Sequence, residues 1–426
     1  MITDRYYLTT MSERKLSSNP WAWVPTLYFA EGIPYFIVNV ISVTMFKRLG
    51  MSNGDVAAYT AMLYLPWVIK PLWSPFVDVI RTKRWWILAM QALVTAGFAA
   101  LALSVSPDAF GLSIVCFYII AFASATHDIA ADGFYLIALD EKRQSLFVGI
   151  RSTFYRISSV FGQGVLVVLA GILETRLGSI PAAWSLTIGG ASVLFALITL
   201  WHLFSLPKVE RAGGGRNASE IAREFSRAWV TFFRKDGVWL AVVFMLLYRL
   251  PEALSVKMLT PFLLDAPADG GLGLSTADSG LVYGTVGVIA LTVGGILGGV
   301  FAASKGLKRS LWPMSLSLAL PCAVYLYMAV AQPSAMWVVY LCVAFDQLGY
   351  GFGFTAYMLY MMRFSEGEFK TSHYAICTAF MALSMMLPGF FAGWLQEAVG
   401  YVGFFIIVML CCLATVFVTF FARRRC

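Results

Sequence analysis

Residues 50–55 read Gly-Met-Ser-Asn-Gly-Asp, and residues 273–278 read Gly-Leu-Ser-Thr-Ala-Asp. Each stretch stands before a long apolar segment, and the shared pattern Gly-x-Ser-x-x-Asp recurs after 223 residues. A second pattern, Ala-Gly-x-Leu with a glycine five positions later, occurs at 170–178 and again 222 residues later at 392–400. Part of the first match is helix-start chemistry, because Ser-x-x-Asp has the spacing of a capping box. Two patterns with nearly the same offset still predict a chain of two similar halves.

The composition is that of a membrane protein. Of 426 residues, 59% are hydrophobic and 13% are charged, and the mean hydropathy is +0.76, whereas soluble domains are about one quarter charged. The apolar stretches are continuous rather than alternating, which favours spanning helices over the strands of a β-barrel. Twelve stretches are found, at about 22–46, 56–78, 85–105, 109–138, 145–173, 183–206, 238–264, 277–303, 310–331, 336–362, 371–396 and 400–421.

We therefore predict an all-α integral membrane fold of twelve transmembrane helices, arranged as two six-helix bundles at 22–206 and 238–421. The polar stretch 207–237 forms the linker, in which Phe225, Trp229 and Phe232 recur at helical spacing among arginines. This pattern favours an amphipathic helix on the membrane surface. The alternative is a solvated linker whose aromatic side chains cover a helix end. Tails at 1–21 and 422–426 complete the organisation.

The distribution of charge predicts the orientation. The side that holds both termini and the linker carries 23 of the 31 lysines and arginines, five lie within spans, and the other side carries only Lys47, Arg48 and Arg176. The positive-inside rule then places both termini in the cytosol. Because the basic residues follow alternate loops, the net charge of +8 does not indicate a nucleic-acid partner. The seven cysteines lack metal-ligand spacing, so we expect no metal and no cofactor.

Three stretches carry a resemblance to a known family. Residues 67–78 read Trp-Val-Ile-Lys-Pro-Leu-Trp-Ser-Pro-Phe-Val-Asp, residues 127–132 read His-Asp-Ile-Ala-Ala-Asp, and residues 392–394 read Ala-Gly-Trp before an acidic turn. The basic loop that begins at Asp78 resembles the cytosolic signature loop of the major facilitator superfamily. A second copy, with Ala303 in place of the acid, lies 225 residues later. The chain is identified as a member of this superfamily and most resembles its AmpG-type muropeptide permeases and the related acetyl-CoA transporters.

The resemblance implies a function. It implies a proton-coupled secondary transporter that imports muropeptides, anionic amino-sugar peptides from peptidoglycan, across the bacterial inner membrane by alternating access. The residues themselves indicate a transporter with a charged cavity, and no P-loop suggests ATP coupling. Three alternatives stay open. They are a transporter of another anionic solute, such as an acyl-CoA or a siderophore-like compound, a membrane-embedded transferase, and a receptor that binds without transporting.

Eleven ionisable side chains fall inside the predicted spans, where each costs roughly 2.5–3.5 kcal/mol. At a helical rise of about 1.5 Å per residue, five of them lie roughly 13–25 Å from the cytosolic ends, near the bilayer centre. These five are Glu31, Asp128, Arg156, Arg249 and Asp346. Glu252 lies slightly beyond, and the remaining five are Lys70, His127, Asp132, Arg151 and Lys257.

The central acids are the predicted proton-coupling residues, namely Asp128, Glu31 and Asp346. A carboxylate in a partly desolvated cavity can hold a proton near neutral pH. Arginines at the same depth could bind an anionic solute bidentately. The predicted substrate-binding residues are Arg249, Arg156, Glu252, Gln347 and Tyr350. In the superfamily, the first, fourth, seventh and tenth helices line the cavity, and most of these residues lie on them.

The alternative for each of these charges is a structural ion pair. Matching depths predict that Asp128 pairs with Arg156 and that Asp132 pairs with Arg151. The second of these pairs, and Asp78 in its basic loop, are predicted to hold the bundle together or to gate it. Lys70 belongs to the same structural group, with its amine reaching the cytosolic headgroups. Lys257 is expected to reach the opposite interface.

Overall fold

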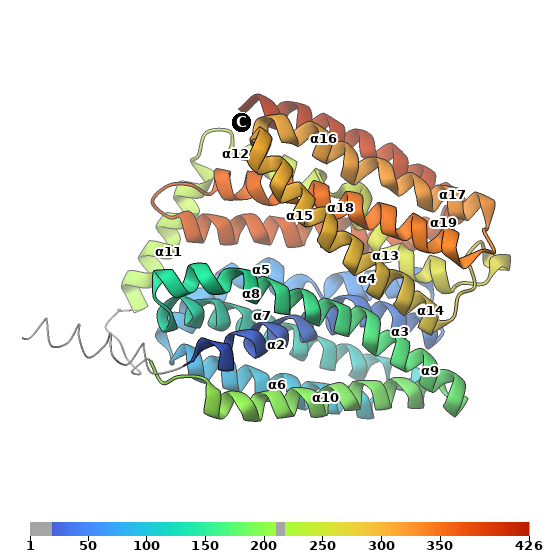
Figure 1. The fold of residues 1–426 in the computed structure, drawn as a ribbon, viewed down its shortest axis with the longest axis horizontal. Coiled ribbons are helices and arrows are strands. Elements are labelled where there is room, and N and C mark those ends of the chain that lie inside the picture. Colours follow the sequence, from blue (N-terminus) through green and yellow to red (C-terminus); the bar gives the residue numbers. More distant parts are fainter. Residues whose placement is uncertain (1–18, 210–217, 426) are drawn as a thin grey trace, which may run out of the picture.

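The computed structural model describes residues 19–209 and 218–425, apart from the side chains of residues 78, 79, 218, 219, 221, 222 and 425. Within this part of the chain every regular element is a helix. Most of the predicted tail 1–21 and residues 210–217 of the predicted linker lie outside the described residues, as does Cys426. In Figure 1 the first half, blue to green, lies beside the second half, yellow to red, and α11 (Ala218–Phe233) runs along both at one end.

The first half covers the first six predicted stretches with helices. Several stretches are interrupted by a π-helical turn or a short break, and short 3-10 turns precede two of them. In chain order the elements are η1 (Pro20–Ala22), α2 (Val24–Phe36), η2 (Ile37–Ile41), α3 (Ser42–Arg48), α4 (Asn53–Met62), α5 (Leu65–Val79), α6 (Lys83–Leu103), η3 (Pro107–Ala109), α7 (Phe110–Ala138), α8 (Glu141–Val160), η4 (Phe161–Leu166), α9 (Val167–Leu177) and α10 (Ile180–Ser205).

The second half covers the last six stretches in the same way. Its last element contains Gly400, whose φ of 69° and ψ of 174° are not helical, so two helices meet there. The elements are α12 (Val238–Leu247), α13 (Leu250–Leu264), η5 (Pro267–Asp269), α14 (Thr276–Ser279), η6 (Gly280–Gly287), α15 (Val288–Lys305), α16 (Leu307–Ala319), η7 (Leu320–Cys322), α17 (Ala323–Ala331), α18 (Met336–Phe364) and α19 (Lys370–Arg425).

The helices have the length and surface of a membrane protein. Among the described residues, nine helical runs are long and apolar enough to cross a bilayer, and one of the nine is α19, which carries two predicted spans. The two other stretches, α4–α5 and α18, are helical but are not among the nine. Large apolar side chains in mid-helix point outward, as Val193, Leu197 and Ile296 do with exposed fractions of 60–64%. Such a continuous apolar surface is suited to lipid.

The repeated glycines and serines of the sequence have repeated structural roles. Gly50 and Gly273 have φ of 90° and 66°, and Gly178 and Gly400 have φ of 63° and 69°. A residue with a Cβ rarely adopts this left-handed conformation, which explains why glycine recurs at these turns. Ser52 and Ser275 each accept a backbone N–H at 3.1 Å, from Asp55 and Asp278, so both serines cap a helix as the spacing predicted.

The molecule has two ends with different connections. The linker end carries α11, the end of α5 and the start of α6, and the far end carries the turns at 49–52, 178–179 and 265–275. Each half has its own apolar core. At the far end the two halves also share a core, because Ala57 of α4 is fully buried against Leu254 and Met258 of α13.

Candidate functional site

A cluster of charged side chains lies inside the first half. Lys70 of α5 forms an ion pair with Asp128 of α7, and about a fifth to a quarter of each side chain is exposed. The predicted pair of Asp128 with Arg156 is therefore wrong, as is the predicted reach of Lys70 to the headgroups. Lys70 lies nine residues before the end of α5, about 13 Å from it, so a buried carboxylate on the neighbouring helix is nearer than water. Pairing also avoids burying either charge alone.

Asp132 and Arg151 come together one turn nearer the linker end. Arg151 Nη2 lies 2.8 Å from Asp132 Oδ1, and the Tyr28 hydroxyl donates to the same oxygen at 3.2 Å. The guanidinium also stacks over the Tyr28 and Tyr135 rings, at 4.4 and 5.2 Å from their centroids. The Asp132 side chain is 47% exposed, so water at the linker end reaches this pair.

Glu31 of α2 completes the cluster from the first helix. Its side chain is buried, and its Oε2 atom has no hydrogen-bond partner. It lies close enough to Asp128, Asp132 and Arg151 to interact with their charges. The cluster thus contains three carboxyl groups and two cations, Lys70 and Arg151. With every group ionised it would carry one excess negative charge, which a single proton would neutralise.

A neutral hydrogen-bonded chain supports the cluster from behind. Gln91 Nε2 lies 3.0 Å from His127 Nε2, and Gln91 Oε1 lies 3.0 Å from His202 Nδ1. His202 Nε2 in turn lies 2.9 Å from the Thr26 hydroxyl. All of these groups except Thr26 are almost completely buried. The chain joins α7, α6, α10 and α2, and it fixes the residue next to Asp128 in the helix.

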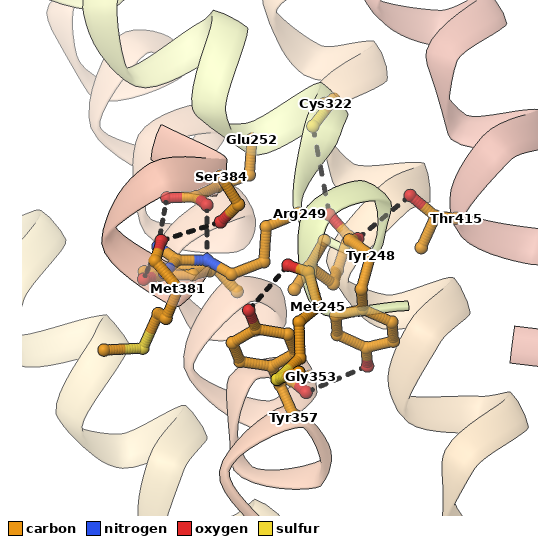
Figure 2. A network of polar contacts seen from close by, with 12 residues as sticks. Met245, Tyr248, Arg249, Glu252, Cys322, Gly353, Tyr357, Met381, Ser384 and Thr415 are labelled. Atoms are coloured by element: carbon orange, nitrogen blue, oxygen red, sulfur yellow. Dashed lines mark hydrogen bonds and ion pairs between the residues drawn. The ribbon is translucent and has the colours of Figure 1, made fainter. Parts of the chain in front are cut away.

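A second charged site occupies the centre of the second half (Figure 2). Arg249 donates to both carboxylate oxygens of Glu252, at 2.9 and 3.2 Å, and to the Tyr350 hydroxyl at 2.7 Å. The Arg249 and Glu252 side chains are each 7% exposed. The structure therefore brings three predicted substrate-binding residues together, with the arginine held in a bidentate pair.

A break between α12 and α13 places Arg249 there. Pro251 follows the break and supplies no backbone donor, so nearby carbonyls need partners from other helices. The Tyr357 hydroxyl donates to the Met245 carbonyl at 2.7 Å, and the Thr415 hydroxyl donates to the Tyr248 carbonyl at 3.0 Å, as Figure 2 shows. The backbone around Arg249 is therefore irregular but fully supported.

The remaining predicted site residues occupy separate places. Asp346 and Gln347 are buried in α18, where Asp346 Oδ2 accepts from the Tyr325 hydroxyl at 2.6 Å and from Gln347 Nε2 at 3.0 Å. Arg156 extends towards α15 of the other half, because a Cβ added to Gly295 would lie 3.6 Å from its Nη2 atom. Asp78 belongs to α5, but its side chain lies outside the described residues.

The repeated sequence patterns meet each other across the two halves at the far end. Gly171 packs so closely on Ala277 at the start of α14 that a Cβ would collide with its backbone. Three residues later, Glu174 Oε2 accepts from the hydroxyl of Thr276, the first residue of α14, at 2.7 Å. Glu174 also binds Arg48 at 3.0 Å within its own half.

The second copy makes the reciprocal contact. Gly393 of α19 packs against the backbone of Asn53, the first residue of α4, and the Gly54 backbone N–H donates to Glu397 Oε1 at 2.7 Å. A carboxylate is favourable there, because the first N–H groups of a helix are free and its dipole is positive. We call these two contacts, Glu174 with Thr276 and Glu397 with Gly54, the reciprocal clasp.

Further polar contacts close the far end beside the clasp. Asn53 Nδ2 lies 2.7 Å from Gln396 Oε1 and 3.0 Å from both Asp265 Oδ2 and the Tyr401 hydroxyl. Lys47 forms an ion pair of 2.6 Å with Asp265. At the linker end, by contrast, a cavity of about 180 Å³ lies between α5, α11 and α19. The conformation is thus one in which the far end is joined and the linker end is looser.

The family is decided by comparison with known proteins. A family model described as Major Facilitator Superfamily matches residues 26–372. The chain belongs to this superfamily. It is therefore a multi-pass membrane transporter of the secondary type, and its relatives and structural neighbours are transporters rather than enzymes.

Individual relatives narrow the resemblance. The anhydromuropeptide permease of Escherichia coli K12 is 24% identical over 391 residues, which cover 89% of this chain and 75% of that protein. A putative transporter, AmpG 4, of Rickettsia conorii is 22% identical over 418 residues, covering 94% and 95% of the two chains. The resemblance to AmpG-type permeases is thus confirmed.

Solved structures of low identity confirm the fold alone. A bacterial homologue of the lysosomal transporter Spinster has a TM-score of 0.70 at 14% identity and covers 97% of both chains. A POT family transporter has a TM-score of 0.74 at 11% identity and covers 94% of this chain and 95% of its own.

Sequence reasoning missed several partners of the predicted residues. Lys257 is not at an interface as expected but is 1% exposed, since α4 and α19 cover it. Tyr28 and Tyr325 were missed because tyrosine is common throughout the chain. Glu174 could have been found, since it follows the repeated Ala-Gly-x-Leu pattern directly. Within the described residues no group of three His, Cys, Asp or Glu side chains has the arrangement of a metal site.

Proposed function

We propose that this chain is a proton-coupled secondary transporter that imports muropeptides across the bacterial inner membrane. In this proposal the bundles at 22–206 and 238–421 rock about the solute, and both tails and the linker 207–237 face the cytosol. The substrate class is supported by the relatives, one of which is named an anhydromuropeptide permease. The orientation is supported by the excess of lysine and arginine at the linker end.

The charge balance of the first-half cluster is the observation that carries proton coupling. Three carboxyl groups, on Glu31, Asp128 and Asp132, face only two cations. An uncompensated charge inside the bilayer is costly, so the cluster is electrically balanced when one proton is bound. We place that proton between Glu31 and Asp128, since Glu31 Oε2 has no other partner. Its release to the cytosol would follow Asp132, the most exposed member.

The second half supplies the solute site. Arg249 binds Glu252 bidentately in this conformation, and a solute carboxylate presents the same two oxygens to a guanidinium. Substrate binding would then exchange one carboxylate for another, so no charge is left unpaired at any step. Arg156 reaches across from the first half and would close on a solute held between the bundles.

The decisive experiment is uptake of labelled anhydro-muropeptide into proteoliposomes with an imposed proton gradient. We expect accumulation that collapses when a protonophore is added. The matched variants are Asp128→Asn, which should abolish accumulation, and Asp108→Asn in an exposed turn, which should not alter it. Folded protein that accumulates no muropeptide under a gradient would refute the substrate assignment and direct the search to other anionic solutes, such as acyl-CoA.

A further inference from the structure

Lys257 is a buried cation whose charge is not balanced by a neighbouring acid. It is 1% exposed, and within the described residues it forms no ion pair and lies near no charged group that perturbs it. Its Nζ donates to the Thr60 hydroxyl at 3.1 Å and lies 5.1 Å from the centre of the Tyr64 ring. A hydroxyl and an aromatic face are weak compensation for a buried ammonium.

The position of Lys257 relates it to the transport path. It lies eight residues from Arg249 and eight from Asp265, so it stands about 12 Å from the solute site and about 12 Å from the contacts that close the far end. Its stem passes between α4 and α19, where an added Cβ on Gly389 would lie only 3.0 Å from its Cγ. It therefore occupies the joint between the halves that must open for a solute to enter from the far end.

Both partners of the ammonium belong to the opposite half. Thr60 and Tyr64 lie at α4 and just after it, in the first bundle, whereas Lys257 belongs to α13 in the second. When the halves separate at the far end, α4 withdraws and takes both partners with it. The ammonium is then left at the wall of the opened passage without a counter-charge.

We propose that Lys257 is an anion-binding residue of the transport path, which takes a carboxylate of the solute when the far end is open. The assignment rests on the proposed function, because it supposes an anionic solute that enters from this end. In closing, Thr60 and Tyr64 return to the ammonium as the carboxylate moves on towards Arg249. Lys257 thus attracts the solute from outside and is covered again once the far end has closed.

The first test compares uptake of two probes by proteoliposomes that contain the full-length protein. The probes are labelled anhydro-muropeptide and the same compound with its carboxylates converted to amides. For Lys257→Met we expect the KM of the acid to rise about tenfold while the KM of the amide stays within about twofold, and Lys257→Arg should restore most of the affinity for the acid. An equal change for both probes, or no change for either, would overturn the assignment.

The second test does not depend on the identity of the solute. A cysteine at position 60 is buried while the far end is closed, so its reaction with methanethiosulfonate reagents reports the open state. In purified Thr60→Cys protein, the sulfonate reagent should react about tenfold faster than the trimethylammonium reagent, each relative to its rate with a free thiol. Adding Lys257→Met should remove this preference.

The outcomes of the two tests separate the two hypotheses. If wild-type protein accumulates no muropeptide but the cysteine prefers the anionic reagent through Lys257, the proposed substrate fails and the anion-binding residue stands. If the preference is absent, or is unchanged by Lys257→Met, the role of Lys257 fails whatever the protein transports. Elution of each variant as a single folded species by size-exclusion chromatography ensures that neither result reflects unfolding.

Discussion

Thr276→Val should loosen the far end by a calculable amount. The substitution keeps the shape of a fully buried side chain but removes the hydroxyl that donates to Glu174 at 2.7 Å across the two halves. A hydrogen bond to a charged group is worth roughly 1.5–3 kcal/mol. Because Glu174 keeps its ion pair with Arg48 and is not left unpaired, the lower end of this range applies. About 1.4 kcal/mol corresponds to a tenfold shift in the ratio of closed to open protein.

The alkylation rate of a buried cysteine measures this ratio directly. Ala57 is fully buried between the halves, so a cysteine at this position, in protein without the seven native cysteines, reacts only when the far end opens. We expect Thr276→Val to raise the rate with a membrane-impermeant maleimide about tenfold. Such a rate detects the change even when the open state is rare.

Thr292→Val is the matched control. It makes the same substitution one helical run later, where the hydroxyl donates only to the Val288 carbonyl of its own helix at 2.8 Å. Its alkylation rate should stay within about twofold of the parent. Equal rates for all three proteins, or equal acceleration by both substitutions, would show that the reciprocal clasp does not hold the far end closed.

Three further predictions concern other parts of the site and the clasp. Arg249→Lys keeps the charge but not the bidentate geometry, so the KM for anhydro-muropeptide in proteoliposomes should rise at least about tenfold, and an unchanged KM would remove Arg249 from the solute site. Glu31→Gln should uncouple uptake from the proton gradient without preventing exchange of internal for external solute, whereas gradient-driven accumulation at the wild-type level would place the proton elsewhere. Gly393→Val should separate α19 from α4 because a Cβ there collides with Asn53, and the alkylation rate at Ala57→Cys should rise more than with Thr276→Val; a slower reaction would contradict the packing.

The fold could be predicted from the sequence because the bilayer restricts it so strongly. Continuous apolar stretches can only be helices, and their number and length follow from a count along the chain. The repeat added the two halves, since glycines with positive φ and serine caps recur where the same turn is made twice. The break before Pro251 could also be expected, although its effect on the direction of Arg249 could not.

The partners of the charged residues could be predicted only in part. Counting residues gives the depth of a side chain in the membrane, and that was sufficient to pair Asp132 with Arg151. It does not give the rotation of a helix about its axis, so Asp128 was assigned to Arg156 although Lys70 on another neighbouring helix faces it. Lys257 has the same cause, since depth alone could not show that two helices cover it.

The two halves repeat in framework but not in chemistry. The reciprocal clasp uses both copies of each repeated pattern, so one pseudo-symmetric movement breaks both of its contacts at once. The charged residues follow no such repeat. The first half holds three acids with two cations around Glu31, and the second half holds the Arg249–Glu252 pair with Lys257 beyond it. A symmetric hinge with asymmetric charge fits a transporter in which one half binds the proton and the other binds the solute, because the shared movement then couples the two sites without direct contact between them.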